Sequence, residues 1–315
     1  MPDGAGAKKL QELDLIQPFM LESSGIRGGL VRLGPAVDHI LTRHAYPETL
    51  AALLGEMLVL TAMLGSTIKY DGVFSLQTKG AGAVSAMIAD VTSKGDLRGY
   101  AGFDEDRLNA AIEDWARNGS GVPGLGVPEL LGAGHLAFTV DQGPQTERYQ
   151  GIVDLTGQTL SDCLQHYFRQ SEQIQTGLFA ASERSNGEWR AAGIILQRLP
   201  EDSAGKSPPD EDAWRRAMIL QASCTLAELL DPALPANDLL YRLFHEEGVR
   251  VFRRRPLEAR CRCSRKRLVE TLRAMPRERI EELKVGGKVI VTCEFCNRRY
   301  RFDQASLDRI YSTAP

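Results

Sequence analysis

Four cysteines near the C-terminus constrain this 315-residue chain more than any other feature of its sequence. Two pairs, with the spacings Cys-x-Cys and Cys-x-x-Cys, lie 29 residues apart and comprise Cys261, Cys263, Cys293 and Cys296. Zinc prefers a tetrahedral set of ligands, and four thiolates close such a site without an open position. The sequence therefore predicts one Zn²⁺ ion held by these cysteines in the reduced protein. The alternative, four unrelated buried thiols, would need more covering structure than the short strands of this region offer.

The segment between the two pairs has the pattern of a small subdomain. We expect a helix over residues 265–272, a second short helix over 276–283, a turn at Gly286-Gly287 and a strand over 288–292. The strand leads directly to the second pair. A CxxC at the end of a strand is usual for zinc sites, whereas a CxC delivers its two sulfurs from a tighter loop.

Basic residues concentrate around the cysteines. Residues 251–302 contain 16 Lys and Arg against 6 Asp and Glu, whereas the rest of the chain has 22 basic and 35 acidic residues. The net charge of −3 thus hides an acidic body and a basic C-terminal region. Such a region can bind nucleic acid, dock on the body, or stabilise the negative charge of a tetrathiolate centre. The cations nearest to the cysteines in sequence are Arg260, Arg262, Arg265, Lys266, Arg267, Arg298 and Arg299.

The same surroundings permit redox chemistry. Neighbouring cations favour the thiolate, which is the form that attacks oxidants, and a nearby cysteine converts the resulting sulfenic acid into a disulfide. A disulfide removes two ligands, and a small metallo-domain folds on its metal, so oxidation could unfold this region. The remaining cysteines, Cys163 and Cys224, stand apart, and Cys163 lies on an apolar helix face like a small buried hydrophobe.

The rest of the chain has an ordinary globular composition, with 43% hydrophobic and 25% charged residues. Residues 1–15 contain neither the apolar segment nor the cleavage site of a secretory signal. The most apolar stretch, residues 50–64, is expected to be too short to span a bilayer. We therefore expect a cytoplasmic protein without a membrane partner, in a compartment that keeps thiols reduced.

Residues 46–199 mix strand and helix patterns without a strict alternation. Strands are expected over 73–78, 84–91, 97–101, 135–140, 148–155, 174–182 and 188–199, the last two joined by an Asn186-Gly187 hairpin turn. Helices are expected over 47–64, 107–116 and 159–173, and the glycine-rich residues 121–134 are expected to form a loop. The pattern predicts the α+β class, with a mixed sheet body and packed helices.

A turn-rich acidic stretch over residues 200–212 marks the first domain boundary. Two helical segments follow, over 212–230 and 237–247, and a short run over 249–252 precedes the cysteine region.

The sequence contains no convincing nucleotide or hydrolase motif. Gly205-Lys206-Ser207 resembles the end of a phosphate loop, but Pro200 stands where that loop needs glycine, and Pro208-Pro209 forbid the following helix. Gly80-Ala81-Gly82 has the pattern of a tight turn between strands. The five histidines have no ligand spacing. We therefore expect no catalytic residues and no enzyme activity.

With these features together, the chain resembles the 33 kDa chaperonin family, also called heat-shock protein 33, which comprises redox-regulated holdase chaperones. The resemblance extends from about Asp14 onward. The family's zinc module is matched by the four cysteines, by Cys263-Ser264-Arg265 and by Tyr300-x-Phe302-Asp303. Further matches are Leu53-Leu54-Gly55-Glu56, Leu97-Arg98-Gly99-Tyr100, Tyr149-Gln150-Gly151-Ile152-Val153, Tyr167-Phe168-x-x-Ser171-Glu172-Gln173 and Leu240-x-x-Leu243-Phe244-His245-Glu246. Ala191-Ala192-Gly193 departs from the family, which often has two glycines there.

The resemblance implies an α+β chaperone core over residues 1–200, a helical linker over 201–258 and a zinc-binding redox-switch module over 259–315. It implies that the reduced, zinc-bound form is inactive. Oxidation would then pair Cys261 with Cys263 and Cys293 with Cys296, release zinc, and unfold the linker and the C-terminal module. The exposed apolar surface would hold unfolding client proteins without ATP under oxidative stress, with a homodimer as the oxidised form.

Under this resemblance, four apolar linker residues are candidates for client binding: Trp214, Leu226, Leu240 and Phe244. The alternative for the same residues is simple packing of the linker helices on the body.

Two functions of other classes compete with the chaperone on the residues alone. A basic zinc module could bind nucleic acid, but aromatic residues that would stack on bases are sparse, with only Phe295, Tyr300 and Phe302 near the second pair. A thiol oxidoreductase could use Cys293-x-x-Cys296. That motif normally begins a helix in a thioredoxin-like unit, whereas a turn and a strand are expected after Asn297.

Overall fold

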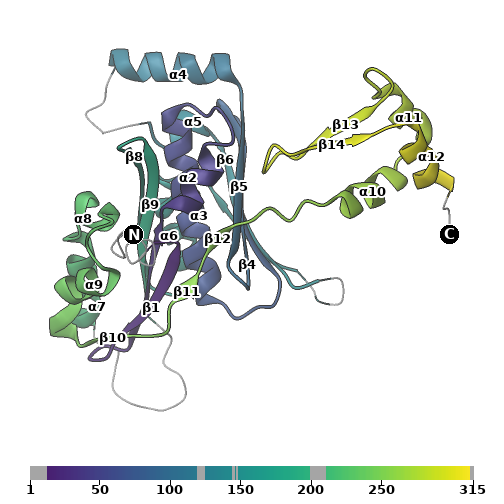
Figure 1. Ribbon diagram of the computed structural model, residues 1–315. Coiled ribbons are helices and arrows are strands. Elements are labelled where there is room, and N and C mark those ends of the chain that lie inside the picture. Colours follow the sequence, from purple (N-terminus) through teal and green to yellow (C-terminus); the bar gives the residue numbers. More distant parts are fainter. Residues whose placement is uncertain (1–12, 119–124, 144–145, 147, 199–210, 313–315) are drawn as a thin grey trace, which may run out of the picture. The chain divides into compact units, whose positions relative to one another are not determined.

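The computed structural model describes residues 13–118, 125–143, 146, 148–198 and 211–312. The chain divides into two compact units, Met1–Ala259 and Arg260–Pro315. The first unit holds two β-sheets and the helices packed on them (Figure 1). The second unit holds the four clustered cysteines.

Each sheet of the first unit has six strands. The first sheet has the order β10 (Val249–Val251), β1 (Leu15–Leu21), β2 (Ile26–Leu33), β9 (Glu188–Arg198) and β8 (Thr176–Ser185), and β11 (Arg255–Pro256) also pairs with β1. The second sheet has the order β12 (Glu258–Ala259), β5 (Asp96–Phe103), β4 (Val84–Thr92), β3 (Val73–Gly80), β6 (Gly134–Asp141) and β7 (Tyr149–Asp154). The described pairs are antiparallel except β12 with β5, which is parallel.

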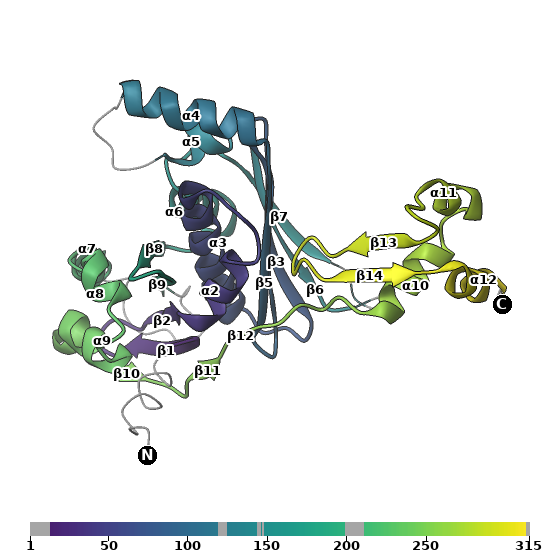
Figure 2. The same cartoon turned by 45° about the horizontal axis from the view of Figure 1, so that its top comes forward.

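Helix α3 (Glu48–Thr67) lies between the two sheets and packs on both, which makes it the centre of the main core (Figure 2). Gly193 on β9 permits this close approach, since a Cβ there would lie 2.7 Å from Val59 Cγ1. Among the described residues, α3 is the one helix with the length and apolar composition to cross a membrane, so the expectation that this stretch is too short was wrong. In the fold, 78% of its apolar window is buried, as in a core helix.

Most elements expected from the sequence are present in the first unit. The hairpin turn at Asn186-Gly187 is confirmed, with φ of 53° and 84°, values that suit a two-residue turn between antiparallel strands. Gly80–Gly82 forms the expected turn between β3 and β4. The unit also contains helices α2 (Pro35–Leu41), α4 (Glu105–Asn118), α5 (Val127–Leu130) and α6 (Leu160–Tyr167).

Two of these expectations need correction. The glycine-rich segment 121–134 is not loop throughout, because its described part contains α5, with Pro128 in the first turn. The helix expected over 159–173 ends as an α-helix at Tyr167 and continues as a π-helical turn over Phe168–Glu172. Gln173 terminates that turn in the left-handed region, with φ of 54°.

Helices α7 (Glu211–Ala222), α8 (Leu226–Leu230) and α9 (Ala236–Phe244) pack on the face of the first sheet opposite α3 (Figure 1). They bury a second apolar cluster against that face. The single helix expected over 212–230 is thus two helices. Thr225 caps α8 in a reciprocal capping box with Glu228, a local signal for a new helix start. Most of the expected boundary at 200–212 lies outside the described residues.

The second unit consists of α10 (Arg265–Arg273), α11 (Arg277–Glu282), the hairpin of β13 (Val289–Thr292) and β14 (Arg299–Phe302), and α12 (Gln304–Ser312). The first two helices, the turn and β13 are confirmed. Its core is small, with six buried apolar residues: Leu272, Ile280, Val289, Phe302, Leu307 and Ile310. A core of this size gives limited stability by itself.

Candidate metal centre

The first cysteine pair, Cys261 and Cys263, lies in the extended segment before α10. Ser264 ends this segment as the N-cap of α10, and its hydroxyl accepts a hydrogen bond from the backbone N–H of Arg267 at 3.3 Å. The cap fixes the point at which the chain leaves the cysteine loop. The first pair is therefore anchored to the start of a helix.

The second pair, Cys293 and Cys296, lies in the turn between β13 and β14. The backbone N–H of Asn297 donates to the Cys293 carbonyl at 2.8 Å, and the Cys293 N–H donates to the Arg298 carbonyl at 3.0 Å. Asn297 has a φ of 55°, in the left-handed region that asparagine tolerates better than most residues. These bonds close a tight turn that carries both sulfurs.

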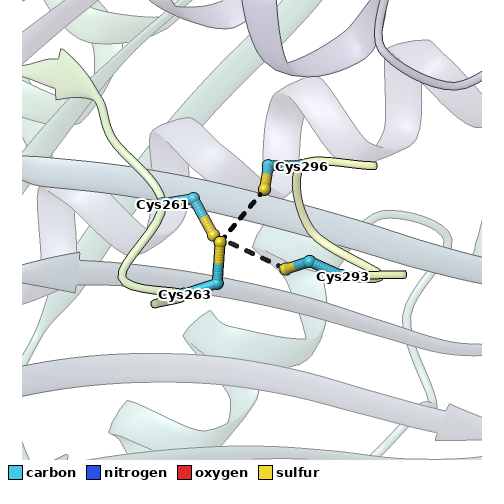
Figure 3. A group of neighbouring side chains, drawn as sticks. All are labelled: Cys261, Cys263, Cys293 and Cys296. Carbon is cyan, nitrogen blue, oxygen red and sulfur yellow. Dashed lines mark hydrogen bonds between the residues drawn. The ribbon is translucent and has the colours of Figure 1, made fainter. Parts of the chain in front are cut away.

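The four Sγ atoms lie within 4.8 Å of one another and point toward a common centre (Figure 3). Cys261 Sγ is 3.7 Å from Cys293 Sγ, and Cys263 Sγ is 3.3 Å from Cys296 Sγ. In a tetrahedral tetrathiolate with metal–sulfur bonds of about 2.3 Å, neighbouring sulfurs lie about 3.8 Å apart. The donor set and its spacing thus fit a four-coordinate metal ion.

Crowding separates the pKa values of the thiols. Burial raises the pKa of Cys261, but hydrogen bonds from the Cys263 backbone and the neighbouring thiols outweigh it and bring the value down to about 7. Burial raises the pKa of Cys293, and the nearby Cys261 thiolate adds to the rise. Burial and the surrounding thiols raise the pKa of Cys296 to about 12. One thiolate therefore forms readily, whereas further ionisation needs a cation at the centre.

Tyr300 of β14 and Arg298, the residue just before that strand, interact with the sulfurs. The Tyr300 hydroxyl donates a hydrogen bond to Cys263 Sγ at 3.2 Å, and this bond raises the pKa of the tyrosine. Tyr300 and the thiols of Cys263 and Cys296 raise the pKa of Arg298, so this guanidinium lies within electrostatic reach of both sulfurs. The sequence pattern indicates Tyr300 as a family residue and a possible stacking aromatic, but it does not indicate that its hydroxyl contacts a thiol.

Other nearby cations stabilise the fold of the unit. Arg265 donates to the Arg301 carbonyl at 2.9 Å, and its guanidinium carbon lies 4.4 Å from the centroid of the Phe302 ring. Arg267 donates to the Arg262 carbonyl at 3.2 Å and so braces the first cysteine loop. Arg265 and Arg267, two of the seven cations nearest to the cysteines in sequence, thus donate to backbone carbonyls of the unit.

The geometry disfavours the two competing functions. Phe302 is fully buried in the core of the unit and Tyr300 is engaged with a thiol, so two of the three aromatic residues near the second pair are not free to stack on bases. Cys296 is followed by a turn and by β14, as expected, and not by the helix of a thioredoxin-like motif.

The linker candidates fall into two groups. Leu240 and Phe244 are fully buried in the second apolar cluster, where the Phe244 ring stacks on Phe19 of β1 at 5.5 Å between centroids. Trp214 is half-buried against the same cluster, whereas Leu226 is 50% exposed. The four residues therefore do not form one continuous exposed stripe.

The isolated cysteines are buried in the first unit and outside the cluster. Burial raises the pKa of both Cys163 and Cys224, which disfavours their reactive thiolate forms.

Comparison with known proteins places these observations in a family context. A family profile described as Hsp33 protein matches residues 14–303. The 33 kDa chaperonin of Caulobacter vibrioides is 39% identical over 295 residues, which cover 92% of this chain and 95% of the relative. The 33 kDa chaperonin of Ectopseudomonas mendocina is 36% identical over 303 residues, 96% of each chain. The crystal structure of the 33 kDa chaperonin (heat shock protein 33 homolog) from Thermotoga maritima matches with a TM-score of 0.76 at 20% identity, over 95% of this chain and 98% of that one.

Proposed function

We propose that this chain, which belongs to the Hsp33 family of chaperones, is an ATP-independent holdase that oxidation switches on. The observation that carries the proposal is the convergence of four Sγ atoms, from two separate loops, within 4.8 Å of one another. In the reduced protein these thiolates would hold one Zn²⁺ ion, which supplies the folding energy that the small core of the second unit lacks.

The switch begins at the thiols. A two-electron oxidant such as hypochlorous acid takes two electrons from a pair of thiolates, which join through a new S–S bond. Hypochlorous acid takes up those electrons and one proton from the solvent and leaves as chloride and water. We propose that the pairs are Cys261 with Cys263 and Cys293 with Cys296, as in the family. All four sulfurs lie close enough to react with a neighbour, and peptide mapping of the oxidised protein identifies which bonds form.

Loss of the thiolates then acts on the linker, which we place at residues 201–258, between a chaperone core over 1–200 and a redox module over 259–315. Its described helices cover an apolar face of the first sheet that includes Phe19, Leu30 and Ile194. Release of these helices would expose that face together with their own buried side chains, Leu240 and Phe244 among them. Exposed apolar surface of this kind binds unfolded chains.

Three further properties belong to the proposal. Client binding needs no ATP, which agrees with the absence of a phosphate-loop pattern in the sequence. The oxidised form is a homodimer, to be checked by size-exclusion chromatography with light scattering. The protein acts in the cytoplasm, where its thiols remain reduced until oxidative stress.

The test follows a thermally unfolding client by light scattering, with reduced protein and with protein treated with hypochlorous acid, while released zinc is measured in parallel. We expect one zinc released per chain and suppression of aggregation only after oxidation. If oxidised protein releases no zinc or leaves aggregation unchanged, the proposal is wrong.

Two variants sharpen this test. Cys293→Ser should lower the bound zinc of the reduced protein and leave the second unit partly unfolded. The matched double variant Cys163→Ala and Cys224→Ala removes the isolated thiols and should retain both zinc and the switch. Normal zinc content in Cys293→Ser would contradict the four-ligand assignment.

A further inference from the structure

A pocket of about 300 Å³ lies in the first unit where α3 ends, beside the turn between β4 and β5. Its three main walls come from separate parts of the chain, residues 62–70, residues 91–95 and residues 255–257, and Ile16 of β1 completes the lining. The third part belongs to the strand β11 and the residue after it, which lead along the chain toward the cysteine unit. We call residues Arg255–Ala259 the strap.

Each wall contributes one cation to the pocket: Lys69, Lys94 and Arg255. No carboxylate lines it, since its fifteen lining residues, all within the described part of the chain, include no Asp or Glu. Asp71 accepts a hydrogen bond from Ser93 Oγ at 3.2 Å but is not among the lining residues. Lys69 and Lys94 make neither a hydrogen bond nor an ion pair in the described structure. The pocket therefore carries an excess of positive charge.

The strap is docked by hydrogen bonds of its own. Leu257 N–H donates to the Asp14 carbonyl at 2.7 Å, and Glu258 N–H donates to the Gly95 carbonyl at 2.9 Å. Arg255 donates to the Ser66 carbonyl at 3.0 Å, near the last turn of α3. The strap thus brings its own cation to a pocket whose two lysines belong to the body.

We propose that this pocket binds a small multivalent oxyanion of the phosphate class, which bridges Arg255 of the strap to Lys69 and Lys94 of the body. Three cations around a cavity of this size match the charge and the oxygen-rich surface of orthophosphate or pyrophosphate. Tyr70 also lines the cavity, with its hydroxyl donating to the Val91 carbonyl at 3.2 Å.

The anion would regulate the switch proposed above, and this part of the inference rests on that function. An anion that binds only while Arg255 is docked stabilises the docked strap over the released one by mass action. Release of the linker after oxidation then becomes slower as the anion concentration rises. Occupancy of the site would thus determine how easily the linker detaches from the core after the module is oxidised.

A purely structural role for the cations is the main competitor. The C-terminal end of a helix carries partial negative charge, and Lys69 and Arg255 could simply offset the last carbonyls of α3. In that case, removal of Lys69 lowers thermal stability in anion-free buffer, and no anion binds at the pocket.

The binding test titrates reduced full-length protein with pyrophosphate at constant ionic strength in a calorimeter, with orthophosphate as a second arm. We expect one site per chain for pyrophosphate, and weaker binding at the same site for orthophosphate because it carries less charge. Lys69→Gln and Lys94→Gln should each weaken binding by about tenfold, the worth of one charge-assisted hydrogen bond. Lys79→Gln, an exposed lysine on β3 outside the pocket, is the matched charge control and should bind as the parent does.

The location is tested by hydrogen–deuterium exchange at the strap. Saturating pyrophosphate should slow exchange of the Leu257 and Glu258 amides in the parent but not in Lys94→Gln. The proposal is overturned if the pocket variants bind as tightly as Lys79→Gln, if many weak sites appear, or if strap exchange is unchanged. Both measurements use reduced protein without client, so their outcome is independent of whether the holdase function holds.

Discussion

The guanidinium of Arg32 on β2 donates a hydrogen bond of 3.1 Å to the backbone carbonyl of Asp231, which lies 199 residues later in the chain. The same guanidinium donates to the carbonyls of Leu234 and Glu228. Arg32 is only 2% exposed, so the two terminal nitrogens of a buried cation on the first sheet bind the chain around α8 and before α9. The linker helices are therefore held by a polar anchor as well as by apolar packing.

Replacing Arg32 by Met should loosen this anchor. The substitution keeps much of the side-chain volume but leaves three carbonyls without their donor, and each unsatisfied buried group costs roughly 1–3 kcal/mol. We expect a loss of about 2–3 kcal/mol in the free energy of unfolding and faster amide exchange over residues 226–244. Under the proposed function, the reduced variant should also suppress client aggregation in part.

Two further variants control this experiment. Arg215→Met removes a guanidinium that is 74% exposed and should change stability little. Arg32→Lys keeps the charge but cannot reach three acceptors at once, so its effect should be intermediate. Unchanged exchange over 226–244 in Arg32→Met would show that apolar packing alone holds the linker.

The Arg32 anchor illustrates what the sequence could not predict. β2 is buried on both faces, with Val31 and Leu33 in the main core and Leu30 in the second cluster, so it has no alternation of polar and apolar residues. Its partners on β9 and around α8 are far away in sequence. Pairings of this kind depend on the assembled fold, so the pattern of residues 15–41 alone predicts neither β1 nor β2.

The cysteine cluster was predictable for the opposite reason. Metal-ligand chemistry is local, so the spacing of the two pairs and the turn after β13 were sufficient to place four sulfurs together.

The contact of Tyr300 with a thiol was harder to predict. Tyr300 lies two residues before the buried Phe302 on the same strand, so its side chain would be expected to join the core. Only the position of the first cysteine loop shows that its hydroxyl reaches Cys263.

Tyr300→Phe tests the role of that hydroxyl. A hydrogen bond to a sulfur stabilises the thiolate and withdraws electron density from it. We expect the variant to retain zinc but to lose it several-fold faster on exposure to hypochlorous acid, as measured with a chromogenic zinc chelator. Tyr311→Phe is the matched control, because its hydroxyl donates to the Leu272 and Met275 carbonyls of the same unit and not to a sulfur. Equal rates of zinc release in the two variants would rule out a specific effect on Cys263.

From the buried carboxyl of Glu56 we predict that the stability of the first unit depends on pH. Burial within α3 raises the pKa of its carboxyl from 4.5 to about 7. Because the pKa of this carboxyl is higher in the folded state than in the unfolded state, protonation of Glu56 stabilises the fold. This stabilisation is fully present below about pH 4.5 and is lost as the pH rises through about 7. The side chain keeps some exposure, so we expect Glu56→Gln to be more stable than the parent at pH 8 by about 1–2 kcal/mol.

Urea denaturation of the parent and Glu56→Gln at pH 5 and pH 8 measures this effect. The gap between the two proteins should be larger at pH 8. Glu183→Gln on the exposed side of β8 makes the same chemical change and should show no such trend. A gap that does not change with pH would mean that the Glu56 carboxyl titrates normally.

Metal removal should separate the two units in stability. The second unit buries six apolar residues, whereas the core around α3 is several times larger, so we expect only the second unit to depend on a metal for its folding. A strong chelator under reducing conditions should abolish amide protection at Val291 and Tyr300, which face each other in the β13–β14 hairpin, and leave Leu58 in α3 protected, as followed by hydrogen exchange. Added Zn²⁺ should restore the hairpin. If the hairpin stays protected without metal, its six-residue core is sufficient, and oxidation at the cysteines could not unfold the module through loss of zinc.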